Sequence, residues 1–160
     1  MTTRRRLVAQ RHLHESVVDL IALMNLPRRD DVLLAEAGVA LDRALFMLLV
    51  GIERFQPIGV VELADRAGRD HTTVSRQVAK LADLGLVERR PSAADRRVRE
   101  ALITPEGRRV TDALAAARHR LTAPVFAQWS DRDLFELDRL LRRYVDDLLA
   151  MSPPEDDSDD

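Results

Sequence analysis

The chain of 160 residues contains no cysteine, and only 4% of its residues are aromatic. Without cysteine, disulfide bonds, thiolate metal sites and thiol-based redox sensing are excluded for this chain. With so few aromatic residues, we expect a core built from leucine, valine, alanine and isoleucine, a composition that suits packed helices. Hydrophobic residues make up 46% of the sequence, which suffices for about one domain.

Long hydrophobic runs are also missing. The longest one, residues 44–52, is far shorter than the ~20 residues that cross a bilayer, and residues 1–6 lack the apolar stretch of a signal peptide. We therefore expect a soluble, cytoplasmic, nucleoid-associated protein that makes no membrane contact.

Motifs of catalysis and cofactor binding are absent too. There is no glycine-rich phosphate loop and no nucleophile elbow, and the four histidines lack a metal-binding spacing: His12, His14, His71 and His119. We expect no enzyme, no catalytic residue, no cofactor and no metal. A zinc-sensing alternative would combine His12, His14, Glu15 and His119.

The formal net charge of −2 conceals a segregation of charge. Residues 66–100 carry nine bases and five acids, whereas residues 155–160 carry five acids and no base. Two interpretations of the basic segment stay open, a phosphate-binding face or an ordinary solvated surface. The acidic tail, residues 152–160, contains no apolar group, and we expect it to be disordered.

Amphipathic helices are predicted at the N-terminal side of the chain. Residues 5–24 have apolar positions three and four apart, and residues 40–54 show one broad apolar face. Pro27 and the charged residues 28–31 are interpreted as a turn or a break. For residues 32–38 a short helix and an extension of the second helix both stay open.

Two further helices are predicted towards the C-terminus. The first covers residues 106–126, with Pro124 as a kink or stop, and the last begins after the N-cap residue Ser130. A heptad-like seam follows along the last helix: Leu134, Leu137, Leu141, Tyr144 and Leu148. We expect these residues to form a dimer interface together with Leu7, Leu13 and Val17, the alternative being an ordinary core helix.

The middle of the chain predicts two short helices separated by a tight turn. Residues 60–67 form the first, Gly68 ends it, and Asp70 is the N-cap of a second helix that begins at His71. Four residues of the second helix are expected to point inward: Val74, Val78, Leu81 and Leu84. The polar residues left on its outer side are Thr72, Thr73, Ser75, Arg76, Gln77 and Lys80.

This outer face has the chemistry of a DNA recognition helix. Short hydroxyl side chains allow close approach to a major groove about 12 Å wide, arginine can bond guanine, and glutamine can bond adenine. Backbone N–H groups of the first turn can also bind phosphate. The alternative is an amphipathic surface helix whose hydroxyls are merely solvated.

An arginine-rich β-hairpin is predicted next. Strands at residues 86–90 and 98–103 flank turn residues 91–95, and the hairpin holds Arg89, Arg90, Arg96, Arg97 and Arg99. Such a wing would place arginines beside phosphates or in the minor groove. Asp95 is expected to pair with Arg97 and brace the wing. Thr104 is the expected N-cap of the following helix, with Pro105 at its first position.

Five sequence elements in this order resemble the MarR family of bacterial transcriptional regulators. They are Val61-Glu62-Leu63-Ala64, Thr73-Val74-Ser75-Arg76, the run from Leu81 through Leu84-Gly85-Leu86-Val87 to Arg89, Asp95-Arg96-Arg97, and Ile103-Thr104-Pro105-Glu106-Gly107. Isoleucine stands at 103 where the family commonly has leucine. The resemblance implies a mainly α fold with a small β-hairpin wing, a winged helix-turn-helix between dimerisation helices. The expected segments are 1–40 (dimerisation), 41–107 (DNA binding), 108–151 (dimerisation) and 152–160 (tail).

The resemblance also implies a function. The chain would be a homodimeric regulator, expected to be a repressor, that binds a palindromic double-stranded DNA operator in a sequence-specific manner and is released by a small, often aromatic, acidic effector. Thr72, Thr73, Ser75 and Arg76 would approach bases, with Gln77 and Lys80 nearby. Arg97 would enter the minor groove, and Arg89, Arg96 and Arg99 complete the expected DNA-binding set. The effector-binding residues do not carry over. The alternative is a winged-helix module for protein–protein contact without DNA binding.

Overall fold

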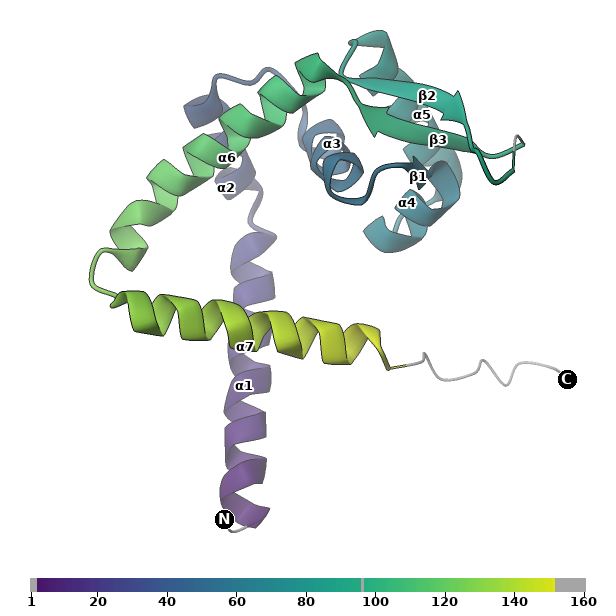
Figure 1. The fold of residues 1–160 in the computed structure, drawn as a ribbon. Coiled ribbons are helices and arrows are strands. Elements are labelled where there is room, and N and C mark those ends of the chain that lie inside the picture. Colours follow the sequence, from purple (N-terminus) through teal and green to yellow (C-terminus); the bar gives the residue numbers. More distant parts are fainter. Residues whose placement is uncertain (1–2, 96, 152–160) are drawn as a thin grey trace, which may run out of the picture. The chain divides into compact units, whose positions relative to one another are not determined.

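The computed structural model describes residues 3–95 and 97–151. This part of the chain holds seven helices and a small antiparallel sheet of three strands (Figure 1). Their bounds are α1 Thr3–Met24, α2 Pro27–Ala37, α3 Arg43–Phe55, β1 Ile58–Gly59, α4 Val60–Ala67, α5 His71–Asp83, β2 Val87–Pro91, β3 Arg99–Ile103, α6 Pro105–Phe126 and α7 Asp131–Leu149. The expectation of a mainly α fold with a small β wing is confirmed.

The chain divides into two compact units, Met1–His119 and Arg120–Asp160, here called the N-terminal and C-terminal units. The division falls within α6, so this helix belongs to both. None of the described helices is both long enough and apolar enough to cross a membrane.

The main core lies under the helix-turn-helix. It joins residues of α3, α4 and α5 to the sheet, and the fully buried members include Leu49, Ile52, Val74, Val78 and Leu81. As expected from the composition, this core is aliphatic. A second cluster packs Phe46 of α3 against Leu33 and Leu34 of α2 and against Leu114 of α6. Together the two clusters fix α3 as the element that both α2 and α5 pack against.

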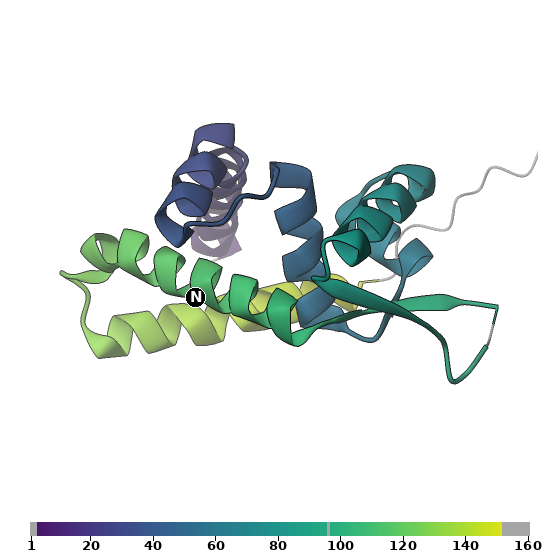
Figure 2. The same ribbon diagram turned by 90° about the horizontal axis from the view of Figure 1, so that it is seen from above.

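The sheet places β3 between β1 and β2. Ile58 pairs with Ala101, and Val87 pairs with Ile103 at the base of the hairpin. The Gln56 Oε1 atom also accepts a hydrogen bond from Ile103 N at 2.9 Å. Seen from above, the β2–β3 hairpin extends beyond the helices of the lobe (Figure 2). Strand β1, with only two residues, was not predicted.

The expected N-caps are confirmed by hydrogen bonds. Asp70 accepts from Thr73 N at 2.9 Å, Ser130 accepts from Asp133 N at 3.2 Å, and Thr104 accepts from Gly107 N at 3.0 Å. Each bond satisfies a backbone donor that the first helical turn would otherwise leave unpaired.

The expected interruptions of the helices are confirmed, whereas the expected burial of Leu84 is wrong. Of the two alternatives at Pro27, the break is confirmed: α1 ends at Met24 and α2 begins at Pro27, where a missing N–H costs nothing, so that residues 28–31 belong to the new helix. Helix α6 ends at Phe126, as predicted, and Pro124 lies inside its last turn. Leu84 is 50% exposed, because the chain reverses at Gly85 (φ 72°) and places Leu86 in the core instead.

Neither α1 nor α7 contains a buried residue within its own unit. Among the expected dimer residues, Leu7, Leu13, Leu137, Leu141 and Leu148 are exposed, and Val17, Leu134 and Tyr144 are half-buried. Phe135 and Leu149 of α7 are exposed as well. Both helices therefore present apolar side chains that the described part of their own unit leaves uncovered.

Gly107 provides a direct test of how α6 begins. A Cβ atom at this position would lie 2.0 Å from the Leu86 carbonyl oxygen and 2.8 Å from Ile103 Cγ1. Gly107→Ala must therefore displace backbone, and we expect it to destabilise the fold by about 1–3 kcal/mol, as overpacked cores do. Chemical denaturation monitored by circular dichroism measures this change.

Gly51→Ala is the matched control. A Cβ atom there would meet only the Leu63 Cδ1 atom, the end of a flexible side chain, at 3.3 Å. Alanine also has a higher helix propensity than glycine. We expect an unchanged or higher stability. Equal destabilisation by the two substitutions would contradict the close approach at Gly107.

Candidate nucleic-acid interface

The turn between α4 and α5 orients α5, the second helix of the helix-turn-helix. Gly68 takes a left-handed conformation (φ 60°) that a glycine adopts at little cost, and its N–H bonds back to Asp65 O. His71 Nε2 lies 3.0 Å from Asp65 Oδ1 across the turn. The connection is so short that His71, the first residue of α5, already contacts α4.

Asp70 carries a charge at the start of α5. Its pKa lies below the ordinary value of 3.8, mainly because its carboxylate accepts the hydrogen bond from Thr73 N. The Thr72 N–H also contributes to the lowered pKa, so the Asp70 carboxylate is the anion that the first-turn backbone donors favour.

The outer face of α5 is close to the expectation. Val74, Val78 and Leu81 are fully buried, which turns the opposite side of the helix to the solvent. Thr72, Thr73 and Arg76 are exposed, and Ser75 is half-buried. These four residues occupy the first two turns of α5, the end that a recognition helix inserts into the major groove.

Gln77 and Lys80 differ from the rest of the set. The Gln77 side chain is half-buried, and among the described residues its buried Oε1 atom has no hydrogen-bond partner. Lys80 is exposed but engaged, since its Nζ atom lies 3.4 Å from Asp42 Oδ2. Both side chains were expected on the outer side of the helix, and the structure shows that neither is simply solvated.

The tip of the wing is a compact turn. Ser92 N donates to Val98 O at 2.8 Å, and Val98 N donates to Asp95 O at 2.9 Å. The Asp95 carboxylate accepts hydrogen bonds from Arg97 N at 2.9 Å and Arg97 Nε at 3.3 Å, so the expected pairing is confirmed. The Arg97 side chain nevertheless stays 92% exposed at the tip. Arg96 lies outside the described residues.

Strand register determines where the other wing arginines project. Arg89 pairs with Ala101 and Pro91 pairs with Arg99, so Arg89 and Arg99 share one face of the hairpin. Arg90 lies opposite Glu100 on the other face. Within residues 3–95 and 97–151, no hydrogen bond or ion pair engages the side chains of Arg69, Arg76, Arg89, Arg90 and Arg99. These guanidinium groups are available to phosphate.

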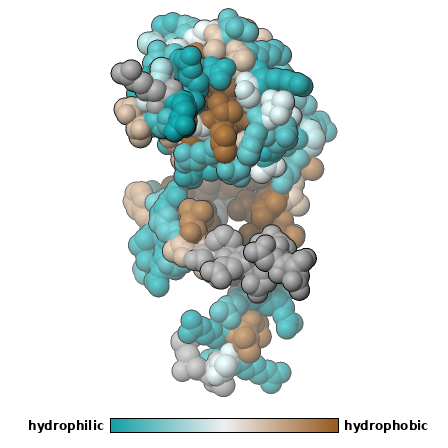
Figure 3. Space-filling model, turned by 90° about the vertical axis from the view of Figure 1, so that its right-hand side faces the viewer, coloured by the Kyte–Doolittle hydropathy of each residue, from teal (hydrophilic) through white to brown (hydrophobic). Residues whose placement is uncertain are grey.

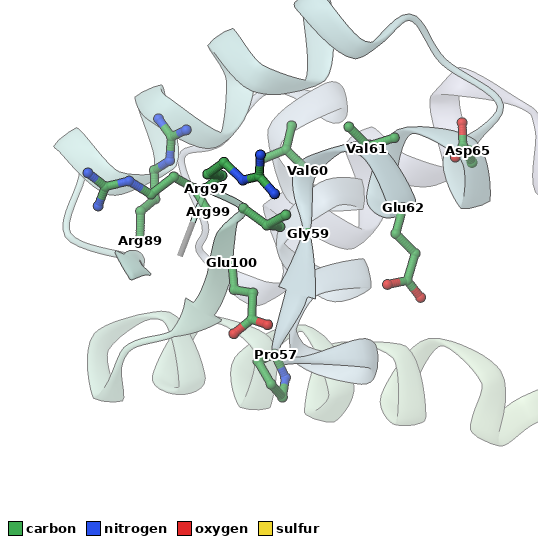
Figure 4. Close-up of a pocket in the computed structure, with 11 residues that line it drawn as sticks. Pro57, Gly59, Val60, Val61, Glu62, Asp65, Arg89, Arg97, Arg99 and Glu100 are labelled. Carbon is green, nitrogen blue, oxygen red and sulfur yellow. The ribbon is translucent and has the colours of Figure 1, made fainter. Parts of the chain in front are cut away.

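A pocket of about 630 Å³ lies between the wing and the start of α4. Arg89, Arg97 and Arg99 gather on one side of it, apart from the carboxylates of Glu62 and Glu100 (Figure 4). Val60, Val61 and Val98 add apolar walls. In Figure 3, the face that carries the wing shows a narrow apolar strip among hydrophilic side chains.

A second, smaller pocket of about 280 Å³ lies between α3 and α4. Its walls are mostly apolar and include Met47, Gly51 and Leu63. Two arginines also line it. Arg66 is occupied by Glu62 at 2.9 Å and by the Phe55 ring at 4.4 Å from the ring centre, which leaves Arg69 to attract an anion.

Comparison with known proteins agrees with this geometry. The model of the MarR family matches residues 41–98, which run from the start of α3 into the wing. A protein of Bacillus subtilis strain 168, the uncharacterized HTH-type transcriptional regulator YxaD, is 31% identical over 103 residues, which cover 64% of this chain and 72% of YxaD. This chain belongs to the MarR family of transcriptional regulators.

Solved MarR structures have the same fold. A MarR family protein from Bacillus stearothermophilus gives a TM-score of 0.70 at 23% identity, over 93% of this chain and 99% of the other. The MarR of Staphylococcus aureus, in complex with salicylate and kanamycin, gives 0.65 at 16% identity, over 93% and 97%. These matches show that this MarR protein has the winged helix-turn-helix fold. At identities of 23% and 16%, they concern the fold alone.

Two features of the site were missed from the sequence. Asp42 reaches Lys80 across 38 positions of the chain, and the pockets depend on elements meeting in space. Among the described residues, no group of three or more histidine, aspartate or glutamate side chains could hold a metal ion. The zinc-sensing arrangement of His12, His14, Glu15 and His119 is not formed there.

The N-cap of α5 makes the stability of the fold depend on pH in the acid range. Because the pKa of Asp70 is lowered on folding, its charge stabilises the folded state above pH 3.8, and this contribution is lost as the pH falls through the lowered pKa. Asp70→Asn keeps the capping acceptor but removes the charge. We expect the wild type to be more stable than this variant at neutral pH, and the difference to shrink below pH 3.8. Thermal melts across this range measure it, and a difference independent of pH would contradict the role of the charge.

Proposed function

We propose that this MarR family regulator is a sequence-specific DNA-binding repressor. The observation that carries the proposal is a set of exposed donors on the two elements of the winged helix, formed by Thr72, Thr73 and Arg76 on α5 and by the unpaired arginines of the wing. The hydroxyls and the Arg76 guanidinium suit base edges in the major groove. Arg89 and Arg99 suit phosphate, and the exposed Arg97 suits the minor groove.

A homodimer is part of the proposal. MarR family regulators bind DNA and act as dimers. In this chain α1 and α7 expose apolar side chains that their own units leave uncovered, and a second copy would bury them. Two winged helices related by a twofold axis would then contact the two halves of a palindromic operator.

Release by a small acid completes the proposal. The structure of the Staphylococcus aureus relative contains salicylate. Here the pocket between α3 and α4 combines apolar walls with the unengaged Arg69, which suits an aromatic ring that carries a carboxylate. An acid in this pocket would lie beside the turn that orients α5, so its binding can shift the recognition helix.

The alternative is a winged helix that contacts protein and not DNA. It would require the same buried residues of α5 but no exposed Arg76 and no unpaired wing arginines. Members of the MarR family are generally not enzymes, and we propose no catalytic residue.

DNA binding is tested by titrating the DNA upstream of the protein's own gene. We expect Arg76→Ala and Arg97→Ala each to weaken binding by ~1–3 kcal/mol, Arg76→Ala with a loss of base preference at one position. Arg109→Ala is the control, because it removes the same charge from an exposed residue of α6 that pairs with Glu106. Equal loss from all three variants would indicate charge alone and contradict specific contacts.

The same titration at several salt concentrations tests the phosphate contacts. A dimer that neutralises about 6–10 phosphates should give a log–log slope near −5 to −9. A footprint should show two half-sites about 10 bp apart. A flat salt dependence would favour the protein-contact alternative, and protection of a single half-site would contradict a symmetric dimer.

The effector site is tested with salicylate as the probe. We expect salicylate to weaken operator binding by the wild type. Ala67→Leu places a larger side chain in the pocket, so this variant should bind DNA normally but no longer respond to salicylate. Ala35→Leu adds the same side chain at an exposed position of α2 outside this pocket and should respond like the wild type. An equal response of Ala67→Leu and the wild type would place the effector elsewhere.

A further inference from the structure

The N-terminal end of α3 joins two segments that lie far apart in the sequence. Asp42 caps this helix, with Oδ1 accepting a hydrogen bond from Leu45 N at 2.9 Å, and its Oδ2 accepts from Lys80 Nζ of α5 at 3.4 Å. The next residue, Arg43, pairs through Nε with the Asp30 carboxylate of α2. Arg43 Nη2 also donates to Asn25 O at 3.3 Å, at the α1–α2 junction.

The position of the Asp42 carboxylate is fixed by this capping role. Its pKa is held below the ordinary value of 3.8, first by the Leu45 N–H and then by Lys80, so the group is charged at neutral pH. Asp42 therefore cannot move away from the helix end without leaving a backbone donor unpaired. The Asp42 carboxylate is therefore held at a defined position beside α5.

Lys80 lies on the same face of α5 as Arg76, one turn further along the helix. Lys80 is the only lysine of the chain, and its side chain is 62% exposed. An exposed pair of this kind contributes little to stability. What the pair determines is the position of the Lys80 ammonium group. Without the pair, the flexible lysine side chain could turn towards a phosphate.

We propose that Asp42 is a positioning residue of the DNA-binding surface, which holds the Lys80 ammonium at the start of α3 and withholds its charge from the phosphate backbone. The proposal rests on the DNA-binding function proposed above. The pair keeps affinity below the value that the unpaired lysine would give. Through Arg43, the same helix end is tied to the α1–α2 junction, so a shift of that junction changes the charge that α5 presents to DNA.

The test compares two substitutions that remove the same charge. Asp42→Asn keeps an equally good capping side chain but loses the anion that holds Lys80. Asp83→Asn is the matched control, because Asp83 is exposed at the end of α5 and, among the described residues, makes no side-chain hydrogen bond or ion pair. Lys80→Gln and the Asp42→Asn/Lys80→Gln double variant complete the cycle.

Operator binding is measured for the full-length protein from about 50 to 200 mM salt. We expect Asp42→Asn to bind more tightly and its log–log slope to steepen by about 1 for each subunit bound. Asp83→Asn and Lys80→Gln should keep the wild-type slope, and the double variant should lose the gain. An unchanged slope in Asp42→Asn overturns the proposal. So does a flatter slope in Lys80→Gln alone, because Lys80 would then already contact phosphate.

A second measurement needs no DNA. Reductive methylation with ¹³C-formaldehyde labels Lys80 as the only lysine, and its resonance is identified by its absence from Lys80→Gln. We expect this resonance to shift in Asp42→Asn and to stay in place in Asp83→Asn. A resonance that does not move in Asp42→Asn overturns the contact itself. Absence of DNA binding by the wild type would instead refute the proposed function, and the two failures are thereby distinguished.

Discussion

The burial of one side of α5 is the constraint on which the rest of the lobe depends. Val74, Val78 and Leu81 have no exposed surface, and they lock the helix against α3 and the sheet. Removing such side chains from water contributes roughly 1.5–3 kcal/mol each. The rotation of α5 about its axis is thereby determined, and the exposed positions of Thr72, Thr73 and Arg76 follow from it.

The same core also sets the place of the wing. Val87 is the first residue of β2 and Ala101 is the central residue of β3, and both belong to this cluster. The hairpin therefore extends outward from the same core residues that hold α5. Arg89, Arg99 and Arg97 lie progressively farther from a fixed base, and strand register sets the projection of Arg89 and Arg99. Helix α5 and the base of the wing are thus held in place by one shared core.

Local chemistry explains which parts were predictable from the sequence. Asp70, Ser130 and Thr104 cap helices within three residues of themselves, so their roles can be recognised without knowing the fold. The misplacement of Leu84 arose because a helical period was continued one residue too far, past the point where Gly85 reverses the chain. The Asp42–Lys80 pair and strand β1 depend on tertiary packing between distant segments, and no local pattern announces them.

The way in which α6 starts has a mechanical consequence. Thr104 N donates to Leu86 O at 3.1 Å, Thr104 Oγ1 donates to Gly85 O at 2.7 Å, and Gly107 packs directly on the same Leu86 carbonyl. Backbone against backbone leaves no soft side chain between the helix and the base of the hairpin. The first turn of α6 is therefore coupled directly to the base of the hairpin, so that a displacement of this turn also displaces the start of β2.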